Sequence, residues 1–157
     1  RESRGKPLSD WTHVAGVVVL DTFNFESIFS EDLPKKEEVI EAFKKHIGPL
    51  SPFGAYNRES TLPRGSEGAL TYDVHINDSN HNAVVIVNIF GDLRDFSYPK
   101  QITDWFSKTF NEDALRDATI LPYIRHAVLT AENDYHEEQH LAVWNKGTKS
   151  YDIIINK

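Results

Sequence analysis

The segment from Ala69 to Asn77 constrains the fold most, because its side chains alternate strictly between apolar and polar. A period of two is typical of a β-strand with one buried face and one solvated face. The polar link Asp78–Asn82 joins this segment to a run rich in Val and Ile that ends at Phe90. Two such segments separated by a short polar link indicate an antiparallel hairpin. The chain is therefore expected to contain a sheet with one packed face.

Apolar patterns elsewhere predict the remaining elements. Segments rich in Val and Ile indicate strands, and apolar side chains spaced by three and four residues indicate helices. Ser97 is the expected N-cap of the second helix, with Pro99 in its first turn. In chain order these elements are a strand over 11–23, a helix over 39–47, a helix over 97–110, helical turns over 111–118, a strand over 120–131 and a hairpin that pairs 141–144 with 151–155.

The order β-α-β-β-α-β followed by a hairpin predicts an α+β fold of the ferredoxin-like, split βαβ type, with helices on one face of an antiparallel sheet. With 157 residues the chain has the size of one domain. We expect residues 1–10 to form a flexible N-terminal arm and residues 11–157 to form a single α+β domain. Because the chain begins at Arg1 and contains no methionine, we expect the initiator to have been removed or to lie upstream, where a targeting segment could also lie.

Composition narrows the function classes. The chain has no cysteine, which rules out disulfides, thiolate nucleophiles and Cys-ligated zinc. No apolar run approaches the roughly 18 residues of a membrane helix, so we expect a soluble, cytoplasmic protein with no membrane partner. The 17 Lys and Arg against 24 Asp and Glu give a net charge of −7, which opposes nucleic-acid binding. A basic protein partner fits this charge better, although acidity also serves solubility alone.

The stretch 48–68 has no sustained period and predicts a long loop, which makes it the first candidate for a binding surface. Its end, Pro63–Gly68, contains Arg64, Ser66 and Glu67 between glycines, so its backbone amides could cradle an anion. No phosphate-binding motif is present, and turn formation is the favoured use of the glycines. The segment 91–95 follows the most apolar strand and adds Asp92 and Arg94, which could line a crevice or form an ion-paired turn.

Asp73 and His75 fall on the polar side of the alternating strand. If that sheet face is open they could lie near Asn88, and near Arg125 or His126, and bind an anion or a metal. A solvated sheet face explains the same alternation without any ligand. The solvated face is the favoured explanation, and Asp73 and His75 are kept as candidate binding residues under the other. We expect no resident cofactor.

His136 and His140 match the H-E-x-x-H spacing, in which a helix presents two imidazoles to zinc and Glu137 acts as general base. The sequence around them argues against this reading. Residues 141–144 continue as strand-like sequence, and 132–140 are polar almost throughout, as a solvated loop would be. A zinc-dependent hydrolase is therefore the alternative hypothesis and not the leading one.

The motif Pro63-x-Gly65-Ser66-Glu67-Gly68, the run Ile89–Phe96 and the opening Trp11–Val14 together resemble a group of small proteins of tailed bacteriophages. The resemblance spans roughly residues 11–130, and it implies a phage origin but no activity or site residue. We expect a non-enzymatic binding module that acts on a host protein or in an assembly, with its partner surface at the loop 49–68 and the segment 91–96. Exposed strand edges also make a homo-oligomer a reasonable expectation, and a virion structural component is a further alternative.

Overall fold

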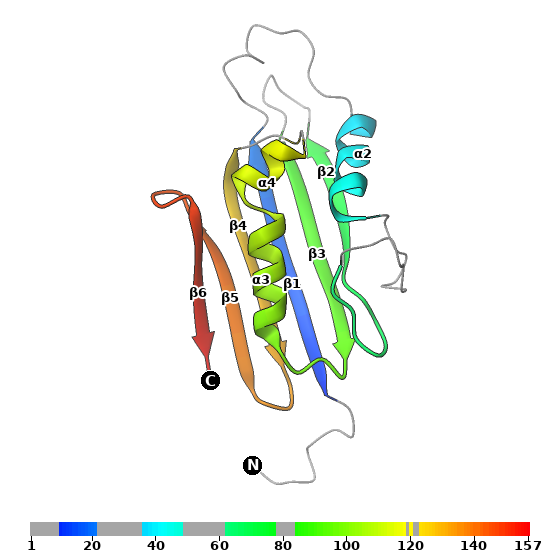
Figure 1. The fold of residues 1–157 in the computed structure, drawn as a ribbon, viewed down its shortest axis with the longest axis vertical. Helices are drawn as coiled ribbons and strands as arrows, with labels where there is room; N and C mark the ends of the chain where they lie inside the picture. The colour runs from blue at the N-terminus through cyan, green and yellow to red at the C-terminus, as the bar shows by residue number, and fades with distance from the viewer. Residues whose placement is uncertain (1–9, 22–35, 49–61, 78–83, 119, 121–122) are drawn as a thin grey trace, which may run out of the picture.

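The computed structural model describes residues 10–21, 36–48, 62–77, 84–118, 120 and 123–157. These residues form one six-stranded antiparallel sheet with the strand order β2-β3-β1-β4-β5-β6, and three helices (Figure 1). The strands are β1 Trp11–Asp21, β2 Thr71–Asn77, β3 Val84–Arg94, β4 Ile124–Asn133, β5 Glu138–Asn145 and β6 Ser150–Asn156. The helices are α2 Lys36–Ile47, α3 Pro99–Thr109 and α4 Glu112–Asp117.

Strand β1 lies in the middle of the sheet and pairs along its length with β3 and β4. Its near-continuous apolar sequence fits this position, since both of its neighbours are strands and its side chains reach both faces. Val14, Val18 and Leu20 point to the buried face, while Ala15, Val17 and Val19 point to the other face. The central strand expected from the Val-rich segment is therefore present.

The three helices lie on the same face of the sheet (Figure 1). Phe43 of α2, Phe106 of α3 and the adjoining Phe110 are fully buried beneath them, and the ring centroids of Phe106 and Phe110 lie 5.4 Å apart. Burying such rings is the main stabilising contribution of a core of this kind. The Tyr72 hydroxyl of β2 donates to the carbonyl of Gly48 at 2.8 Å, which joins the end of α2 to the sheet, and burial raises the pKa of Tyr72 to about 12.

The predicted ferredoxin-like plan, with the order β-α-β-β-α-β, is wrong for this chain. The described elements follow the order β-α-β-β-α-α-β-β-β, and all six strands belong to one sheet. The predicted pairing of 141–144 with 151–155 is confirmed by β5 and β6, which pair from Gln139↔Asn156 to Asn145↔Ser150. This hairpin extends the main sheet, because β5 also pairs with β4 from Val128↔Val143 to Asn133↔Glu138. An α+β class remains appropriate.

The turn predicted at 91–95 is also wrong, because β3 continues through Gly91 to Arg94 and pairs there with the start of β1. Leu93 is fully buried and extends the inward-facing alternation of β3. Glycine is needed at this point because a Cβ atom at Gly91 would lie 2.9 Å from the carbonyl oxygen of Ala69. Ser97 does not cap α3, whose N-cap is Tyr98 without a side-chain bond; the Ser97 hydroxyl donates to Asp10 instead.

Several expectations fall outside the described residues. These are the arm 1–10 apart from Asp10, the loop from 49 to 61 and the link 78–82. Residues 62–68, which were assigned to the same long loop, are described and pack against the end of β3. No helix in the described part of the chain is long and apolar enough to cross a membrane.

Candidate functional site

The face of the sheet opposite the helices carries both apolar and polar side chains, and we call it the open face. No described helix lies on it (Figure 1). Its centre consists of partly exposed apolar side chains from five neighbouring strands. They are Val17 and Val19 of β1, Ile86 and Phe90 of β3, Val128 of β4, Leu141 and Val143 of β5, and Ile154 of β6.

Phe90 is the most exposed aromatic side chain of this centre, with 45% of its surface accessible. It lies opposite Ala15 of β1 and Thr71 of β2, both of which are small and leave its ring standing above the face. A solvated sheet face in a single-layer arrangement normally carries polar side chains here. A contiguous apolar centre on the face that no described helix covers is instead characteristic of a surface that another molecule covers.

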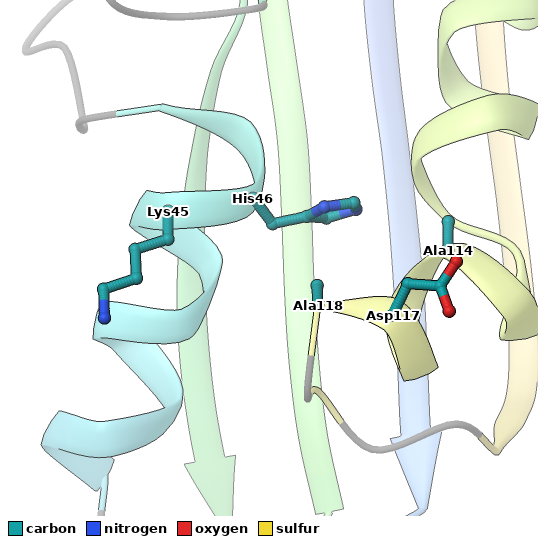
Figure 2. A pocket seen from close by; sticks show the side chains of 5 residues that line it. All are labelled: Lys45, His46, Ala114, Asp117 and Ala118. Carbon is teal, nitrogen blue, oxygen red and sulfur yellow. The ribbon is translucent and has the colours of Figure 1, made fainter.

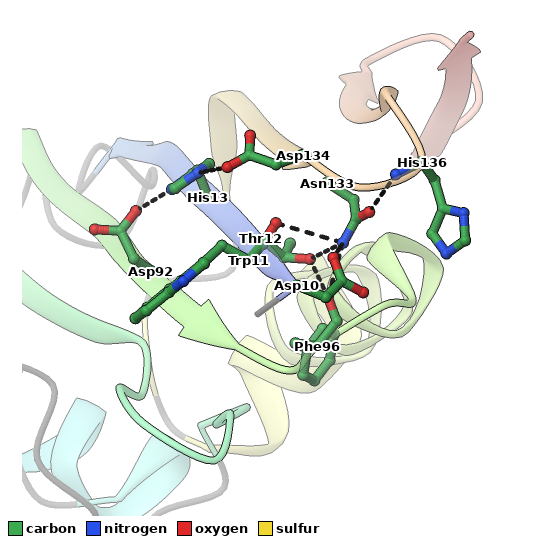
Figure 3. Close-up of polar contacts among 9 residues, drawn as sticks. All are labelled: Asp10, Trp11, Thr12, His13, Asp92, Phe96, Asn133, Asp134 and His136. Carbon is green, nitrogen blue, oxygen red and sulfur yellow. Dashed lines mark hydrogen bonds and ion pairs between the residues drawn. The ribbon is translucent and has the colours of Figure 1, made fainter. Parts of the chain in front are cut away.

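Polar residues border this centre, and acidic ones gather at one end of it. At one end of β1, His13 lies between two carboxylates, with Nδ1 2.5 Å from Oδ1 of Asp92 and Nε2 2.7 Å from Oδ2 of Asp134 (Figure 3). The hydrogen bond to Asp92, and then that to Asp134, raises the pKa of the imidazole above its ordinary value. Glu132 lies directly opposite His13 on β4. This end of the open face therefore carries three acids around one histidine.

The loop 62–70 forms the adjoining rim. Its turn is closed by the amide of Gly65, which donates to the carbonyl of Gly68 at 2.8 Å, and the amide of Ser66 donates to the carbonyl of Arg94 at 2.8 Å. Glu67 forms an ion pair with Arg94. Because the amides of Gly65 and Ser66 already donate to protein carbonyls, they do not form the anion cradle that the glycines suggested. The glycines lie in a closed turn, as the sequence favoured.

The side chains of this rim are also engaged with the end of β3. The Ser66 hydroxyl donates to Oδ2 of Asp95 at 2.6 Å. Gly68 has φ +75°, and a Cβ atom there would lie 2.1 Å from the carbonyl oxygen of Asp92. Arg64 stands slightly apart, in an isolated bridge with Ala69. The structure therefore brings Ser66, Glu67, Asp92 and Arg94 to one edge of the open face.

The other predicted pair lies on a different part of the same face. Asp73 accepts a hydrogen bond from the amide of Asn88 at 2.9 Å, and His75 Nε2 lies 3.4 Å from Oδ1 of Asp73. Their expected proximity to Asn88 is confirmed. Proximity to Arg125 or His126 is not, because β3 and β1 separate β2 from β4. No cluster of three or more His, Asp or Glu side chains able to hold a metal occurs among the described residues.

The H-E-x-x-H segment is not helical. Residues 134–137 form a turn, Glu137 has φ +52°, and Glu138 to His140 belong to β5. His136 is exposed in the turn, whereas His140 is buried and pairs with Glu138. The two imidazoles therefore do not share one helix face, and the geometry that the hydrolase needs is absent from this segment.

A polar network that the sequence did not reveal holds the start of β1. The buried Asn133 amide donates to Oδ1 of Asp10 at 2.7 Å, to Oγ1 of Thr12 at 3.0 Å and to the carbonyl of Phe96 at 3.0 Å (Figure 3). Its own oxygen accepts from the amide of His136 at 2.8 Å. The network joins the start of β1, the segment after β3 and the end of β4. Its role is to hold these segments in place.

A hollow of about 570 Å³ lies on the helical side, between α2 and α4 (Figure 2). Lys45 and His46 of α2 and Asp117 of α4 line it together with Ala114 and Ala118. The His46 ring points across the hollow, and its Nε2 lies 2.7 Å from the carbonyl oxygen of Thr109. That contact connects α2 to α3, so this histidine is accounted for by packing.

The fold and the open face together define an antiparallel α+β domain with one helix-covered face and one apolar, acid-rimmed face. Comparison with protein-family models, with curated proteins and with solved structures found no match.

Proposed function

We propose that this chain is a non-enzymatic protein-binding module whose partner covers the open face. The observation that carries the proposal is the apolar centre, which extends over five strands on the face that no described helix covers. Specific interfaces commonly combine such an apolar centre with a polar rim. The open face has both an apolar centre and polar residues beside it. The polar residues include Asp73, Asp92 and Arg94, which the sequence suggested as binding residues.

The charge of the rim specifies the chemistry of the partner. Asp73, Asp92, Glu132 and Asp134 contribute carboxylates, while the guanidinium of Arg94 is already paired with Glu67. A partner that presents an apolar patch flanked by Lys or Arg would complement this surface and associate faster at low salt. The same acidity, with a net charge of −7, disfavours nucleic acid as the partner.

The proposed context is that of a phage accessory protein acting on a host protein, or within an assembly, in the cytoplasm of the host cell. This rests on the resemblance of the 63–68 and 89–96 motifs to tailed-phage proteins. No cofactor is needed for such a role. A virion structural component would use the same surface and would differ in being found in purified particles.

The test compares two aromatic-to-lysine substitutions in a pull-down of the tagged protein from bacterial lysate, with quantification of each captured protein. Phe90→Lys places a cation in the apolar centre, and Tyr98→Lys changes a residue with 67% exposure outside the open face. We expect a stoichiometric partner that wild type and Tyr98→Lys retain and that Phe90→Lys loses by at least about tenfold. Equal retention by Phe90→Lys would contradict the assignment of the open face.

Two further measurements on the same preparation separate the alternatives. The double substitution Arg64→Ala and Glu67→Ala reports whether the rim loop contributes, and unchanged affinity would remove the loop from the interface. A zinc analysis tests the hydrolase, which predicts one tightly bound ion per chain.

A further inference from the structure

The two edges of the sheet differ in how they are protected. Edge strands expose unpaired backbone groups, and proteins usually blunt them with charged or polar side chains. β2 follows this rule on its open face, where Asp73 and His75 carry the polar groups and His75 is 67% exposed at its side chain. β6 does not follow it, because Ile153, Ile154 and Ile155 are exposed by 44%, 46% and 50%.

These three isoleucines cover both faces of the edge. Ile153 and Ile155 lie opposite Ala142 and His140 of β5, on the helical side, and Ile154 lies opposite Leu141 on the open face. Within the described chain, β5 is the one strand that pairs with β6. A strand with free outer backbone groups, apolar side chains on both faces and no proline or glycine is suited to further strand pairing.

We propose that β6 pairs antiparallel with β6 of a second copy of this chain, about a two-fold axis at Ile154. Side chains that face each other across two paired strands lie on the same side of the sheet. When the two strands are related by a two-fold axis perpendicular to the sheet, one residue therefore faces its own copy, and the axis passes between the two. With Ile154 at the axis, Ile153 faces the second copy's Ile155, and the four side chains form an apolar cluster on the helical side. The pairing is independent of the proposed function.

Charge selects this register over its neighbour. With Ile154 at the axis, Asp152 faces Asn156 and Tyr151 faces Lys157, so no like charges oppose each other. With the axis at Ile153, Lys149 would face Lys157 and Asp152 would face Ile154, which sets like charges together and an acid against an apolar side chain.

Pairing of β6 with β6 also fits the two sheet edges better than pairing of β6 with β2 of another copy. Self-pairing closes as a dimer and leaves only the two polar β2 edges exposed. Pairing of β6 with β2 of another copy would be open-ended and would build filaments, and the polar face of β2 gives it no apolar match. The composition of the two edges thus favours a closed dimer.

The test is the concentration dependence of mass, measured by sedimentation velocity and by light scattering after gel filtration. Wild type is expected at twice the 18.0 kDa of one chain. Ile154→Lys and Ile154→Asp each place like charges at the axis and should weaken the dimer by at least about tenfold in Kd. An equimolar mixture of the two variants should recover a dimer, because the axis then pairs Lys with Asp.

The control substitution is His75→Lys at the other edge, which should leave the dimer intact. Phe90→Lys should also leave it intact, since that residue lies in the open face and not at the edge. A wild type of 18.0 kDa at all concentrations would overturn the proposal. A dimer that survives Ile154→Lys, a mixture that fails to associate, or a dimer lost in Phe90→Lys would overturn it as well. Circular dichroism of each single variant verifies that the sheet is retained.

Discussion

Asn133 provides the sharpest test of how the rim is built, because one isosteric change inverts its hydrogen bonding. Its amide nitrogen donates to Asp10, Thr12 and the carbonyl of Phe96 at distances of 2.7 to 3.0 Å, and the side chain is fully buried. Asn133→Asp keeps the shape but replaces this donor with an oxygen. At neutral pH the new carboxylate would face the carboxylate of Asp10 and two further acceptors.

The magnitude follows from the two N–H groups that these three acceptors share. Each net hydrogen bond contributes about 1 kcal/mol, and an uncompensated buried charge costs about 3–5 kcal/mol. We expect the free energy of unfolding of Asn133→Asp to fall by about 3–5 kcal/mol at pH 7, and by about 1–2 kcal/mol at pH 4, where the protonated acid restores one donor. The sign follows because burial and Asp10 raise the pKa of the new acid in the folded state. Its stability is therefore retained below the unfolded pKa and lost as the pH rises through the folded one.

The assay is urea unfolding of wild type and variant from pH 4 to pH 7, followed by tryptophan fluorescence. The matched control is Asn111→Asp at the N-cap of α4, where the side-chain oxygen accepts from the amide of Ala114 at 2.8 Å. A carboxylate keeps this cap, and the donors that it loses, to the carbonyls of Ser107 at 2.9 Å and Lys108 at 3.2 Å, lie at a partly exposed site, so the loss should stay below about 1.5 kcal/mol. A pH-independent loss at Asn133, or a loss no larger than that of the control, would refute this account of the network.

Three further substitutions test other parts of the structure by the same unfolding assay. Gly68→Ala should lower stability by at least about 1–2 kcal/mol, because φ +75° is strained for alanine and the Asp92 carbonyl is in the way, while Gly147→Ala should cost less; equal costs would contradict this. In the wild type, the protonated His13 should stabilise the fold below about pH 6.5, and this stabilisation should be lost as the pH rises through the raised folded-state pKa. His13→Gln should remove it, at a cost under about 1 kcal/mol because the pair is exposed to solvent. Parallel pH profiles of wild type and variant would argue against this. Phe110→Ala should cost about 3–5 kcal/mol through the cavity it leaves, and a loss below about 1 kcal/mol would show that the aromatic cluster is not a packed core.

The strands and helices could be predicted where their signal is local. The alternation of 69–77 and the apolar spacing of α3 report which side chains are buried, and the structure places both elements there. The sequence wrongly predicted a turn at Gly91, because the requirement for glycine there comes from a distant segment. The carbonyl oxygen of Ala69 leaves too little room for a Cβ atom. The same limit applies to the overall plan, since the pairing of β5 with β4 is decided by register across the sheet and not by order along the chain.

The candidate site shows the same division. The polar side of β2 follows from alternation, so Asp73 and His75 could be selected from the sequence, whereas Asp92 was selected as part of an expected turn where the structure has the end of β3. His13 could not, because its two partners come from β3 and from the turn after β4, and only the sheet register brings them together. The H-E-x-x-H spacing was ambiguous for a related reason: a polar string does not distinguish a helix from a turn, and the positive φ of Glu137 is what ends that possibility.

The two proposed interfaces are geometrically compatible, and their combination has a consequence for binding. A two-fold axis perpendicular to the sheet at Ile154 keeps the helices of both copies on one side and both open faces on the other. The apolar centres would then lie in one continuous surface, since Ile154 already belongs to the open face and adjoins Leu141 of β5. A partner with two matching sites could bind both faces at once, and the second contact would form at a high effective concentration. Breaking the β6 pairing would therefore weaken binding to such a bivalent partner far more than binding to its isolated single site.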